Sequence, residues 1–505
     1  MSTQVADEPS GYSSRATSGV LWMTVQKWFS RVLGLLTVVI LTRLLTPADF
    51  GLVAVAMSVV PFLYLLSDLG FSAYLVQAEK PRPQDYSTAF WYSLSAGTVL
   101  ALGLGLLGTP LGWLLKDAGV AHIMWGLAPT VLLVSAGSVP AAIMRRELRF
   151  QTIALQTIAA GTVGQVVAVV TAFAGFGVWA LVLQTSVTQL VVTALNWRSA
   201  GWRPSRAFSM PEFRRMLRYG VSIVAVEVSA LGRVWAENAI VATTLGLNGL
   251  GYLSIAQRLV QVAQDLTATA ITPVSTVVFA QIRVSSERVA SAYSRAQSLV
   301  YAIVTPVMVF LAVAAALLVP LLFGGQWATS VPPAQGLAIA GILTVGASLD
   351  NGLYYGLGRP GRWLAYAVGV DALTVGTTWV MAPHGLDLVA LGFVGVALAA
   401  TAVRWPLVGR QIQTAWWRLG AQFLRAACLA GVTGLAGLLV LPRTAGQPDL
   451  VRLAVTGLVV VLVWSAAVRL LLPAASREIW RLVRSTAGRL RRPPRAAAQV
   501  SRGEG

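Results

Sequence analysis

The sequence predicts an all-α integral membrane protein, and its composition and its apolar runs lead to that prediction. Of the 505 residues, 56% are hydrophobic and only 11% are charged, whereas soluble domains carry about 25% charged residues. Apolar runs of about 18 residues or more recur between Val20 and Leu472, and each is long enough to cross the hydrocarbon core as a helix. The runs do not alternate apolar with polar residues, which argues against transmembrane strands.

The polar breaks between the runs predict about fourteen transmembrane helices. Connections on the predicted outer side are very short, as at Thr46-Pro47 and 246–248, so we expect no extracellular domain. The expected helices are 17–44, 47–78, 85–115, 118–146, 150–175, 177–199, 214–245, 248–280, 288–323, 330–357, 361–382, 386–408, 417–441 and 450–473.

A weak internal repeat suggests how these helices are grouped. Residues 41–56 align with residues 241–256 so that Gly51 coincides with Gly251, and each segment is a helix end, a tight outer turn and a helix start. Many secondary transporters are built from repeated halves with the substrate held between them. The expected organisation is a cytoplasmic N-terminal segment (1–16), a six-helix N-lobe (17–199), a cytoplasmic amphipathic loop (200–213), a six-helix C-lobe (214–408), two further helices (409–473) and a basic cytoplasmic tail (474–505).

The basic residues predict the orientation of the chain. Lys and Arg gather in alternate connections, including the one at Arg404, and are rare in the others. Cytoplasmic connections of membrane proteins are enriched in Lys and Arg, so both termini are expected in the cytoplasm. This distribution also accounts for the net charge of +19 without a nucleic-acid partner, because no soluble basic domain is present. The predicted outer side carries only Arg43, Lys116, Arg443 and Arg452.

Several classes of chemistry are not expected. Cys428 is alone in an apolar helix, and His122 and His384 are isolated, so we expect neither disulfides nor a metal site. The sequence has no glycine-rich phosphate loop of the Walker type, which excludes an ATPase, and no catalytic constellation or cofactor motif. It also has no cleavable signal peptide. The outer connections are too short to hold the donor site of a membrane glycosyltransferase, so transport is favoured over catalysis.

Two basic segments with interleaved aromatic residues suggest contact with the membrane surface. They are the cytoplasmic loop from Arg198 to Arg218 and the tail beyond Pro473. We interpret both as interfacial segments that lie on anionic lipids. The alternative is that their charges only anchor the orientation of the chain.

Charged residues inside the predicted helices are the candidate site residues, because an ionisable group at a helix centre costs about 2.5–3.5 kcal/mol. The basic candidates for a cationic, substrate-binding cavity are Lys27, Arg31, Arg233 and Arg258. The acidic candidates, which would line the cavity or couple transport to an ion, are Asp68, Glu227, Glu237, Asp265, Asp350 and Asp371.

Two interpretations of these charges remain open. Arg233, Glu237 and Arg258 could form a buried ion-pair cluster that fixes helix packing, or they could belong to a cationic cavity for an anionic headgroup. Lys27 and Arg31 lie one turn apart with no carboxylate on their helix, which favours the cavity. Asp68 could pair with Lys27. Asp350 and Asp371 could equally be packing groups or cavity groups, and with Asp68 they are the candidate coupling acids.

A series of short motifs extends over most of residues 17–360. The motifs are 65–77 (LLSDLGFSAYLVQ), 87–92 (STAFWY), 138–140 (SVP), 145–150 (RRELRF), 175–181 (GFGVWAL), 199–204 (SAGWRP), 236–240 (AENAI), 245–252 (LGLNGLGY) and 322–327 (LFGGQW). Each motif is weak alone, but their order and spacing together are specific. In this series the chain resembles bacterial oligosaccharide flippases of the polysaccharide-transport family.

The resemblance implies the fold and the function of the multidrug/oligosaccharidyl-lipid/polysaccharide exporter superfamily. The implied fold has two six-helix lobes that rock between inward and outward states, as in multidrug exporters. The implied substrate is an oligosaccharide linked to undecaprenyl pyrophosphate, carried to the outer leaflet of the bacterial plasma membrane for assembly of a surface polysaccharide. A polymerase or other assembly proteins would be partners. Family members often have Asp where Glu237 stands here, a departure that keeps the charge.

Other functions remain open within and beyond this superfamily. A drug or cation antiporter would present carboxylates on the first helix, whereas Lys27 and Arg31 suit an anion better. A lipid II flippase would share the helix count and a cationic cavity, although the motifs 145–150 and 175–181 favour the polysaccharide branch. A non-transporting membrane partner of a polysaccharide synthase is the third alternative.

Overall fold

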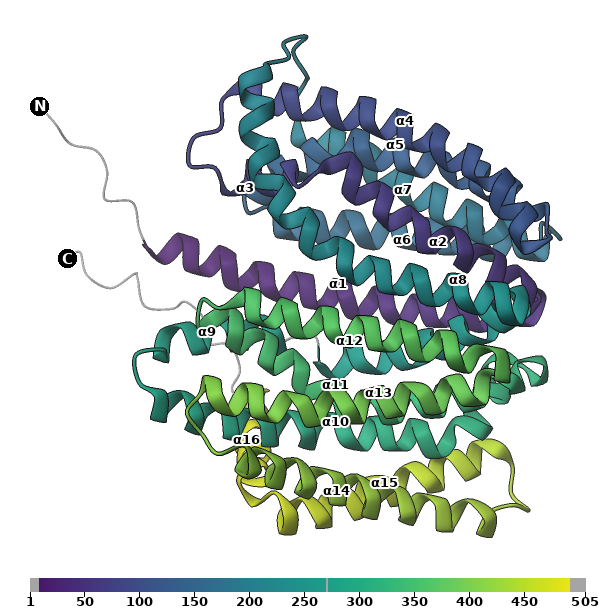
Figure 1. Cartoon of the computed structure of the whole chain (residues 1–505), viewed down its shortest axis with the longest axis vertical. Coiled ribbons are helices and arrows are strands. Elements are labelled where there is room, and N and C mark those ends of the chain that lie inside the picture. Colours follow the sequence, from purple (N-terminus) through teal and green to yellow (C-terminus); the bar gives the residue numbers. More distant parts are fainter. Residues whose placement is uncertain (1–8, 269–270, 491–505) are drawn as a thin grey trace, which may run out of the picture. The chain divides into compact units, whose positions relative to one another are not determined.

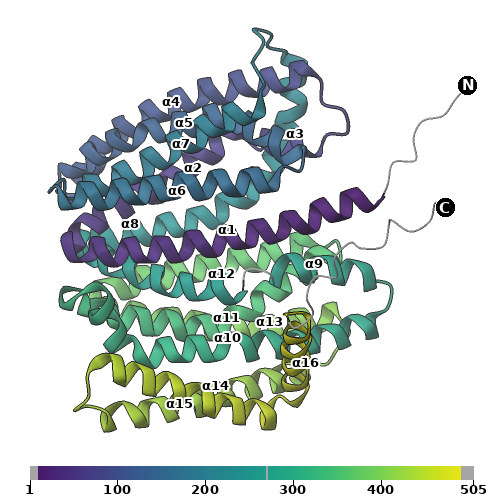
Figure 2. The same cartoon turned by 180° about the vertical axis from the view of Figure 1, so that it is seen from behind.

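The computed structural model of this chain describes residues 9–268 and 271–490, and it confirms the predicted all-α membrane architecture (Figures 1 and 2). Within these ranges every regular element is a helix. Twelve helical segments there are long and apolar enough to cross a membrane. The predicted number of fourteen spans remains a prediction.

The described helices follow the predicted order. They are α1 (Pro9–Leu44), α2 (Pro47–Asp68), α3 (Phe71–Gln77), α4 (Pro83–Leu115), α5 (Gly119–Arg146), α6 (Phe150–Phe173), α7 (Trp179–Ala200), α8 (Met210–Ala268), α9 (Ile271–Ile282), α10 (Ser286–Phe323), the 3-10 helix η1 (Gly325–Ser330), α11 (Val331–Gly356), α12 (Pro360–Met381), the 3-10 helix η2 (Ala382–His384), α13 (Leu386–Gln411), α14 (Trp416–Arg443), α15 (Asp449–Leu471) and α16 (Pro473–Leu490).

The predicted and described helices differ at two breaks. The range 47–78 divides into α2 and α3, because Leu69 and Gly70 both take left-handed backbone angles (φ 44° and 72°) that end a helix. The two helices expected on either side of 246–248 form the single element α8, which is broken at Gly246 (φ 72°, ψ −178°). That conformation is open to glycine and strained for other residues.

The chain folds as two compact units. Unit 1 contains the described residues up to Val262 together with Leu318–Leu337 and Leu364–Val396. Unit 2 contains Ala263–Leu317, Ala338–Trp363 and the described residues from Ala397 onward. The division into lobes 17–199 and 214–408 remains a prediction.

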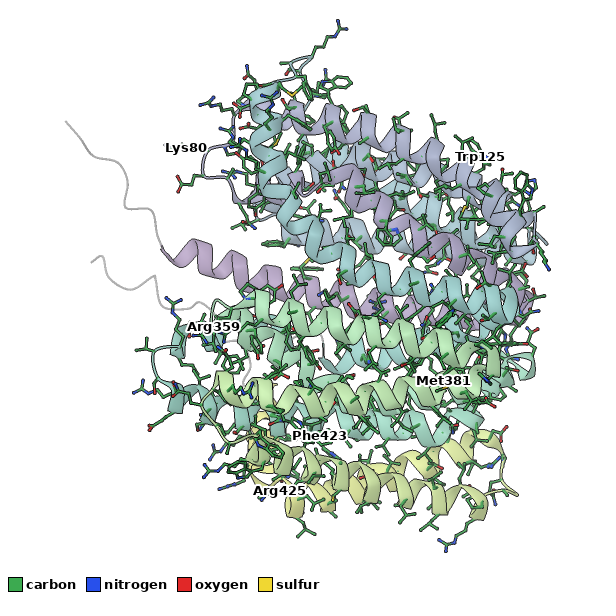
Figure 3. All side chains as sticks on the ribbon, in the orientation of Figure 1. Lys80, Trp125, Arg359, Met381, Phe423 and Arg425 are labelled. Atoms are coloured by element: carbon green, nitrogen blue, oxygen red, sulfur yellow. The ribbon has the colours of Figure 1, made fainter. Side chains whose placement is uncertain are left out.

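In unit 1, α4, α5, α7 and α6 lie side by side, and α1 packs along α6 (Figures 1 and 2). An aromatic cluster holds one end of this layer together, where Phe71, Phe90 and Met216 are buried. Lys80 and Trp125 lie at opposite ends of the unit 1 helices (Figure 3). The two ends are predicted to face opposite sides of the membrane, and which end is cytoplasmic remains a prediction.

The repeat that aligns residues 41–56 with 241–256 appears in unit 1 as a pair of reciprocal contacts. The backbone of Gly51 packs against the carbonyl oxygen of Leu247, and the backbone of Gly251 packs against the carbonyl oxygen of Pro47. A Cβ atom on either glycine would collide with the facing carbonyl oxygen. Because Pro47 and Leu247 are equivalent in the repeat, the two turns pack on each other symmetrically.

Polar groups around these turns fix their geometry. Thr46 caps α2 in a capping box with Asp49, whose carboxylate accepts from the Thr46 backbone N–H at 2.9 Å. The Trp327 indole N–H and the Gln326 amide both donate to the carbonyl oxygen of Thr42, at 2.9 and 2.7 Å. The motif 322–327 therefore closes over the end of α1.

We predict that Gly51→Val destabilises the protein, because the new side chain cannot fit against the carbonyl oxygen of Leu247. The expected cost is about 1–3 kcal/mol, typical of overpacking in a close contact. Thermal unfolding of the purified protein in detergent measures it. Gly103→Val is the matched control, since nothing lies within 4 Å of a Cβ atom built on Gly103. Equal unfolding temperatures for the two variants would contradict this account of the turns.

In unit 2, α14 and α15 pack as a hairpin (Figure 1), and α16 follows α15 directly. The α16 helix covers the start of the tail that the sequence predicts to be interfacial. The Arg469 guanidinium carbon lies 5.6 Å from the centre of the Trp480 ring, as in a cation–π contact. Residues 491–505 of that predicted tail, and residues 1–8 of the predicted N-terminal segment, lie outside the described residues.

The predicted amphipathic loop 200–213 is largely irregular in the structure, and part of it packs within the protein. Residues 201–209 are irregular, and α8 begins at Met210. The Trp202 ring lies 5.8 Å from that of Phe90, and Phe213 lies 5.8 Å from Phe71, so both aromatic residues pack within the protein. Phe208, in the same loop, is exposed.

Candidate functional site

Two of the three predicted cavity arginines lie close together in unit 1. Arg31 lies within the membrane span Trp22–Leu44 of α1, and Arg258 lies on α8. Their charges are near enough to repel each other. The Arg258 guanidinium reaches α1 at Gly34, where a Cβ atom would be 3.7 Å from its Nη2. The Arg258 side chain therefore reaches from α8 to α1.

An amide side chain lies close to the Arg258 guanidinium beside Gly34. The Gln165 amide nitrogen on α6 would also lie 3.7 Å from a Cβ atom on Gly34, and Gln165 accepts a hydrogen bond from Gln184 at 2.8 Å. Among the described residues, no carboxylate forms an ion pair with Arg258. Adjacent guanidinium groups are suited to an anion, because a guanidinium binds phosphate oxygens in bidentate fashion, so the anion site remains a prediction.

Lys27 lies on the same helix, one turn before Arg31, and both side chains are exposed. In the described part of the chain Lys27 forms no ion pair. The predicted Lys27–Asp68 pair is absent there. Instead, the Asp68 carboxylate accepts from the Ser72 backbone N–H (3.3 Å) and hydroxyl (2.5 Å), which joins the end of α2 to α3.

Arg233 differs from Arg258, because two carboxylates neutralise it. Its Nη1 lies 2.7 Å from Glu237 Oε1, and its Nε lies 3.0 Å from Asp371 Oδ1 on α12. The i,i+4 pair that the sequence suggests is therefore present, and Asp371 extends it into a triad. One of the two interpretations above joins Arg233, Glu237 and Arg258 in a single ion-pair cluster. In the structure Arg258 lies beside α1 instead, away from the triad.

The triad carries a net charge of −1 and borders a cavity. Glu237 is buried, whereas Arg233 and Asp371 are partly exposed. A cavity of about 580 Å³ between α8 and α12 is lined by Arg233, Asp371 and mostly apolar residues such as Ile240, Val375 and Trp379. Such a site offers a protonatable or cation-attracting group rather than free positive charge.

We predict that Arg233→Ala lowers the amount of folded protein. Its removal leaves Glu237 and Asp371 as two facing carboxylates, and an uncompensated buried charge costs at least about 2–3 kcal/mol. Fluorescence-detected size-exclusion chromatography of a tagged protein measures the folded fraction. Adding Glu237→Gln is expected to restore most of it. A fully folded Arg233→Ala protein that lacks export would instead assign Arg233 to the substrate site.

Asp350 belongs to a buried network in unit 2. Its Oδ2 lies 3.0 Å from Arg404 Nε, and its Oδ1 accepts from the Tyr293 hydroxyl at 2.5 Å. Arg404 also donates to the Tyr301 hydroxyl at 3.0 Å. The sequence places Arg404 among the basic residues of the inner side. In the structure it lies inside α13 and is only 2% exposed, where Asp350 matches its charge.

The remaining predicted acids are Glu227 and Asp265. Glu227 is exposed on α8, and Asp265 is partly buried near the end of the same helix. Within the described residues, no cluster of three or more His, Cys, Asp or Glu side chains could hold a metal ion.

Several site residues could not be identified from the sequence. Gln165, Gln184 and the counter-ion relation of Asp350 to Arg404 depend on helices far apart in the chain. A further group, Tyr74 and Tyr219 with the arginines at the start of α8, was visible only as a basic segment. The one sequence feature that indicates this group is the i,i+4 spacing of Arg214 and Arg218, which places both on one face of a helix.

Comparison with known proteins gives a family match and several similar proteins. The profile of a family described as "Polysaccharide biosynthesis protein" matches residues 40–332. The succinoglycan biosynthesis transport protein ExoT of Rhizobium meliloti (strain 1021) is 28% identical over 337 residues, or 66% of this chain and 68% of that protein. The lipopolysaccharide biosynthesis protein WzxC of Escherichia coli (strain K12) is 25% identical over 335 residues, or 65% of this chain and 67% of that protein.

Among solved structures, the lipid II flippase MurJ in an inward closed conformation is similar to this chain. The two align with a TM-score of 0.72 at 13% sequence identity, covering 89% of this chain and 98% of that chain. At this identity the likeness shows a shared fold.

Proposed function

Because this chain belongs to the family of polysaccharide biosynthesis proteins, we propose that it is a flippase for lipid-linked oligosaccharides. Its substrate is an oligosaccharide unit on undecaprenyl pyrophosphate, and it moves this unit from the inner to the outer leaflet for assembly of a surface polysaccharide. It is a transporter and carries out no covalent chemistry. Anionic membrane lipids and a polysaccharide polymerase are its further partners.

The observation that carries this proposal is the pair Arg31 and Arg258. A diphosphate carries about two negative charges at neutral pH, and its passage through a low-dielectric region requires fixed positive charge. The guanidinium groups of Arg31 and Arg258, which are close enough to repel each other, supply that charge. Lys27, one turn away on α1, extends the positive surface. The lipid chain can stay in the bilayer while the headgroup moves past these residues.

The packing of the two outer turns suits the inward state of such a cycle. The contacts of Gly51 with Leu247 and of Gly251 with Pro47 hold the turns together. In the proposed cycle, the substrate binds from the cytoplasm while these contacts are closed, and release to the outer leaflet requires them to separate.

The triad of Arg233, Glu237 and Asp371 is the proposed coupling site. A net charge of −1 beside a cavity can accept a proton or a cation. Binding of that ion would weaken the ion pairs of Arg233 with Glu237 and Asp371. Moving one charge across 100 mV of membrane potential supplies about 2.3 kcal/mol. Asp350, which is sealed in its network with Arg404, is a packing group in this proposal.

The proposed location is the bacterial plasma membrane, with both termini in the cytoplasm. Single cysteines at Lys80 and Arg359 are expected to react with a membrane-impermeant thiol reagent only from the inside. Cysteines at Lys116 and Arg443 are expected to react from the outside. The background is Cys428→Ser, since the native thiol is exposed. Outside labelling at Arg359 would contradict this orientation.

Deletion of the gene tests the proposed function in cells. The lipid-linked oligosaccharide should then accumulate in the inner leaflet, where a membrane-impermeant glycan-modifying enzyme added to intact cells cannot reach it. Accumulation in the outer leaflet would indicate a block after transport, as expected for a non-transporting partner of a polysaccharide synthase.

A further inference from the structure

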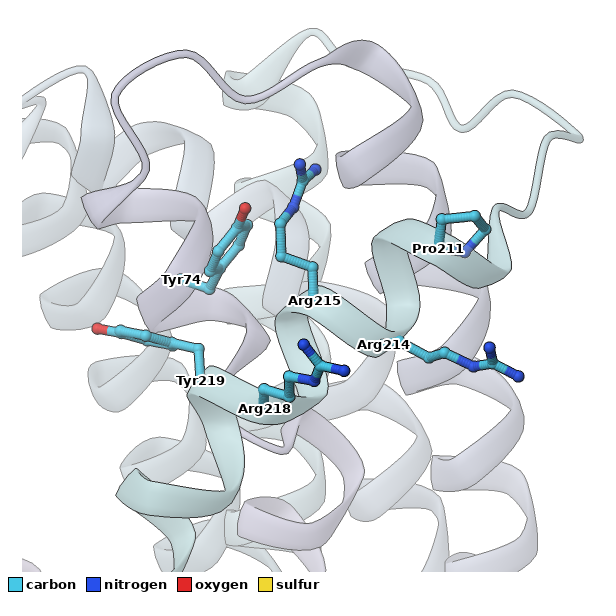
Figure 4. Close-up of a pocket in the computed structure, with 6 residues that line it drawn as sticks. All are labelled: Tyr74, Pro211, Arg214, Arg215, Arg218 and Tyr219. Atoms are coloured by element: carbon cyan, nitrogen blue, oxygen red, sulfur yellow. The ribbon is translucent and has the colours of Figure 1, made fainter.

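A basic pocket lies in unit 1, at the start of α8 (Figure 4). Its volume is about 660 Å³, within the size range of about 300–1,000 Å³ that is usual for small-molecule sites. Tyr74 of α3 faces the first turns of α8, which carry the other lining residues. The lining residues are Tyr74, Pro211, Arg214, Arg215, Arg218 and Tyr219.

One of the three arginines is already neutralised. Arg215 lies 2.9 Å from Asp85 and contacts Glu212, which also pairs with Arg82 at 3.4 Å. These two acids and two arginines form a network without net charge. It fixes the start of α8 against the start of α4.

The other two arginines carry positive charge into the pocket. Arg214 and Arg218 are exposed and lie four residues apart on α8, on one face of the helix. Among the described residues neither forms an ion pair. Like charges at this spacing destabilise a helix, and a bound anion would relieve that repulsion.

The walls of the pocket are rigid. On the opposite side of α8, Met216 is fully buried in the aromatic cluster, and the backbone of Gly220 packs against the carbonyl oxygen of Leu69. The Tyr74 and Tyr219 rings meet edge to face at 5.6 Å, and the Tyr219 hydroxyl donates to Gln77 at 2.6 Å. Tyrosine rings with one wet end are suited to the boundary between lipid and water.

We propose that this pocket is a loading site that binds the diphosphate of a membrane-embedded lipid on the cytoplasmic face, before the headgroup reaches Arg31 and Arg258. This inference rests on the proposed flippase function. Arg214 and Arg218 bind the phosphate oxygens, and the tyrosine pair borders the lipid interface. The pocket is larger than a diphosphate, which leaves room for the first sugar.

Binding of undecaprenyl pyrophosphate to the full-length protein in nanodiscs tests the proposal. The variant Arg214→Gln/Arg218→Gln is expected to bind at least about tenfold more weakly than the native protein, a change of one decade in Kd. The matched control, Arg203→Gln/Arg206→Gln, removes the same charge from the preceding loop and should bind as the native protein does. Arg214→Lys/Arg218→Lys should recover part of the affinity, because the charge remains and the planar fork is lost.

The outcomes separate the pocket from the proposed function. Equal affinity of the glutamine variant and its control, with both proteins folded by thermal unfolding, would overturn the pocket assignment and leave the flippase proposal intact. No binding of undecaprenyl pyrophosphate by the native protein would overturn both. The glutamine variant could lose affinity for phosphatidylglycerol to the same extent as for undecaprenyl pyrophosphate. The pocket would then be a general anionic-lipid site, and the diphosphate assignment would be wrong.

Discussion

Replacing Arg258 with alanine is expected to abolish polysaccharide export while the protein still inserts and folds. The substitution removes one half of the guanidinium pair beside Gly34. Two charge-assisted hydrogen bonds to a phosphate, at about 1.5–3 kcal/mol each, correspond to at least about a hundredfold loss of affinity. Folding should tolerate the change, because no described carboxylate depends on Arg258. Surface polysaccharide per folded protein measures the effect.

Two companion variants sharpen this prediction. Arg258→Lys should restore only part of the export, since lysine keeps the charge and lacks the bidentate fork. Arg425→Ala, at an exposed arginine of α14 (Figure 3), is the control and should leave export unchanged.

A separate variant tests the part of the site on α1. Normal export by a stable Lys27→Ala/Arg31→Ala protein would exclude α1 from the substrate site.

Replacing Asp350 with alanine is expected to have the largest effect on stability. It leaves Arg404, only 2% exposed, without its carboxylate, and it removes the acceptor of the Tyr293 hydroxyl. Breaking a buried ion pair from one side costs about 3–5 kcal/mol, a large part of the stability of most proteins. Folded yield and thermal unfolding in detergent measure the loss.

The paired variant Asp350→Leu/Arg404→Met provides the control for this prediction. It replaces both charges with apolar groups, which is often neutral for a buried pair. The double variant should therefore fold better than Asp350→Ala alone. If both folded like the native protein but neither supported export, Asp350 would be a transport residue and its structural assignment would be wrong.

The helices could be predicted from the sequence because bilayer thickness dictates their length. Each of the fourteen predicted ranges overlaps a described helix, and the outer turn at Thr46-Pro47 lies where proline and a capping threonine require it. The break at Gly246 was also expected, from its alignment with the first turn. The division of 47–78 into α2 and α3 was missed, because a single glycine in an apolar run does not by itself end a helix.

The site could be predicted only as a set of charges, because spacing along the chain does not define partners across helices. The i,i+4 relation of Arg233 to Glu237 was readable, since both lie on one helix. Its third member, Asp371, comes from α12 and changes the group from a neutral pair to a net negative triad. In the same way, the sequence does not show that Arg404 pairs with Asp350, because the two residues lie on different helices.

Transport by the purified protein tests the central claim most directly. The protein is reconstituted in liposomes that contain a fluorescent oligosaccharide on undecaprenyl pyrophosphate, and a membrane-impermeant quencher reports which leaflet holds the label. We predict that the native protein moves the label between leaflets without ATP, and that Arg258→Ala, folded and reconstituted to the same density, does not. Movement that requires ATP, or equal movement with the Arg258→Ala protein, would contradict the account.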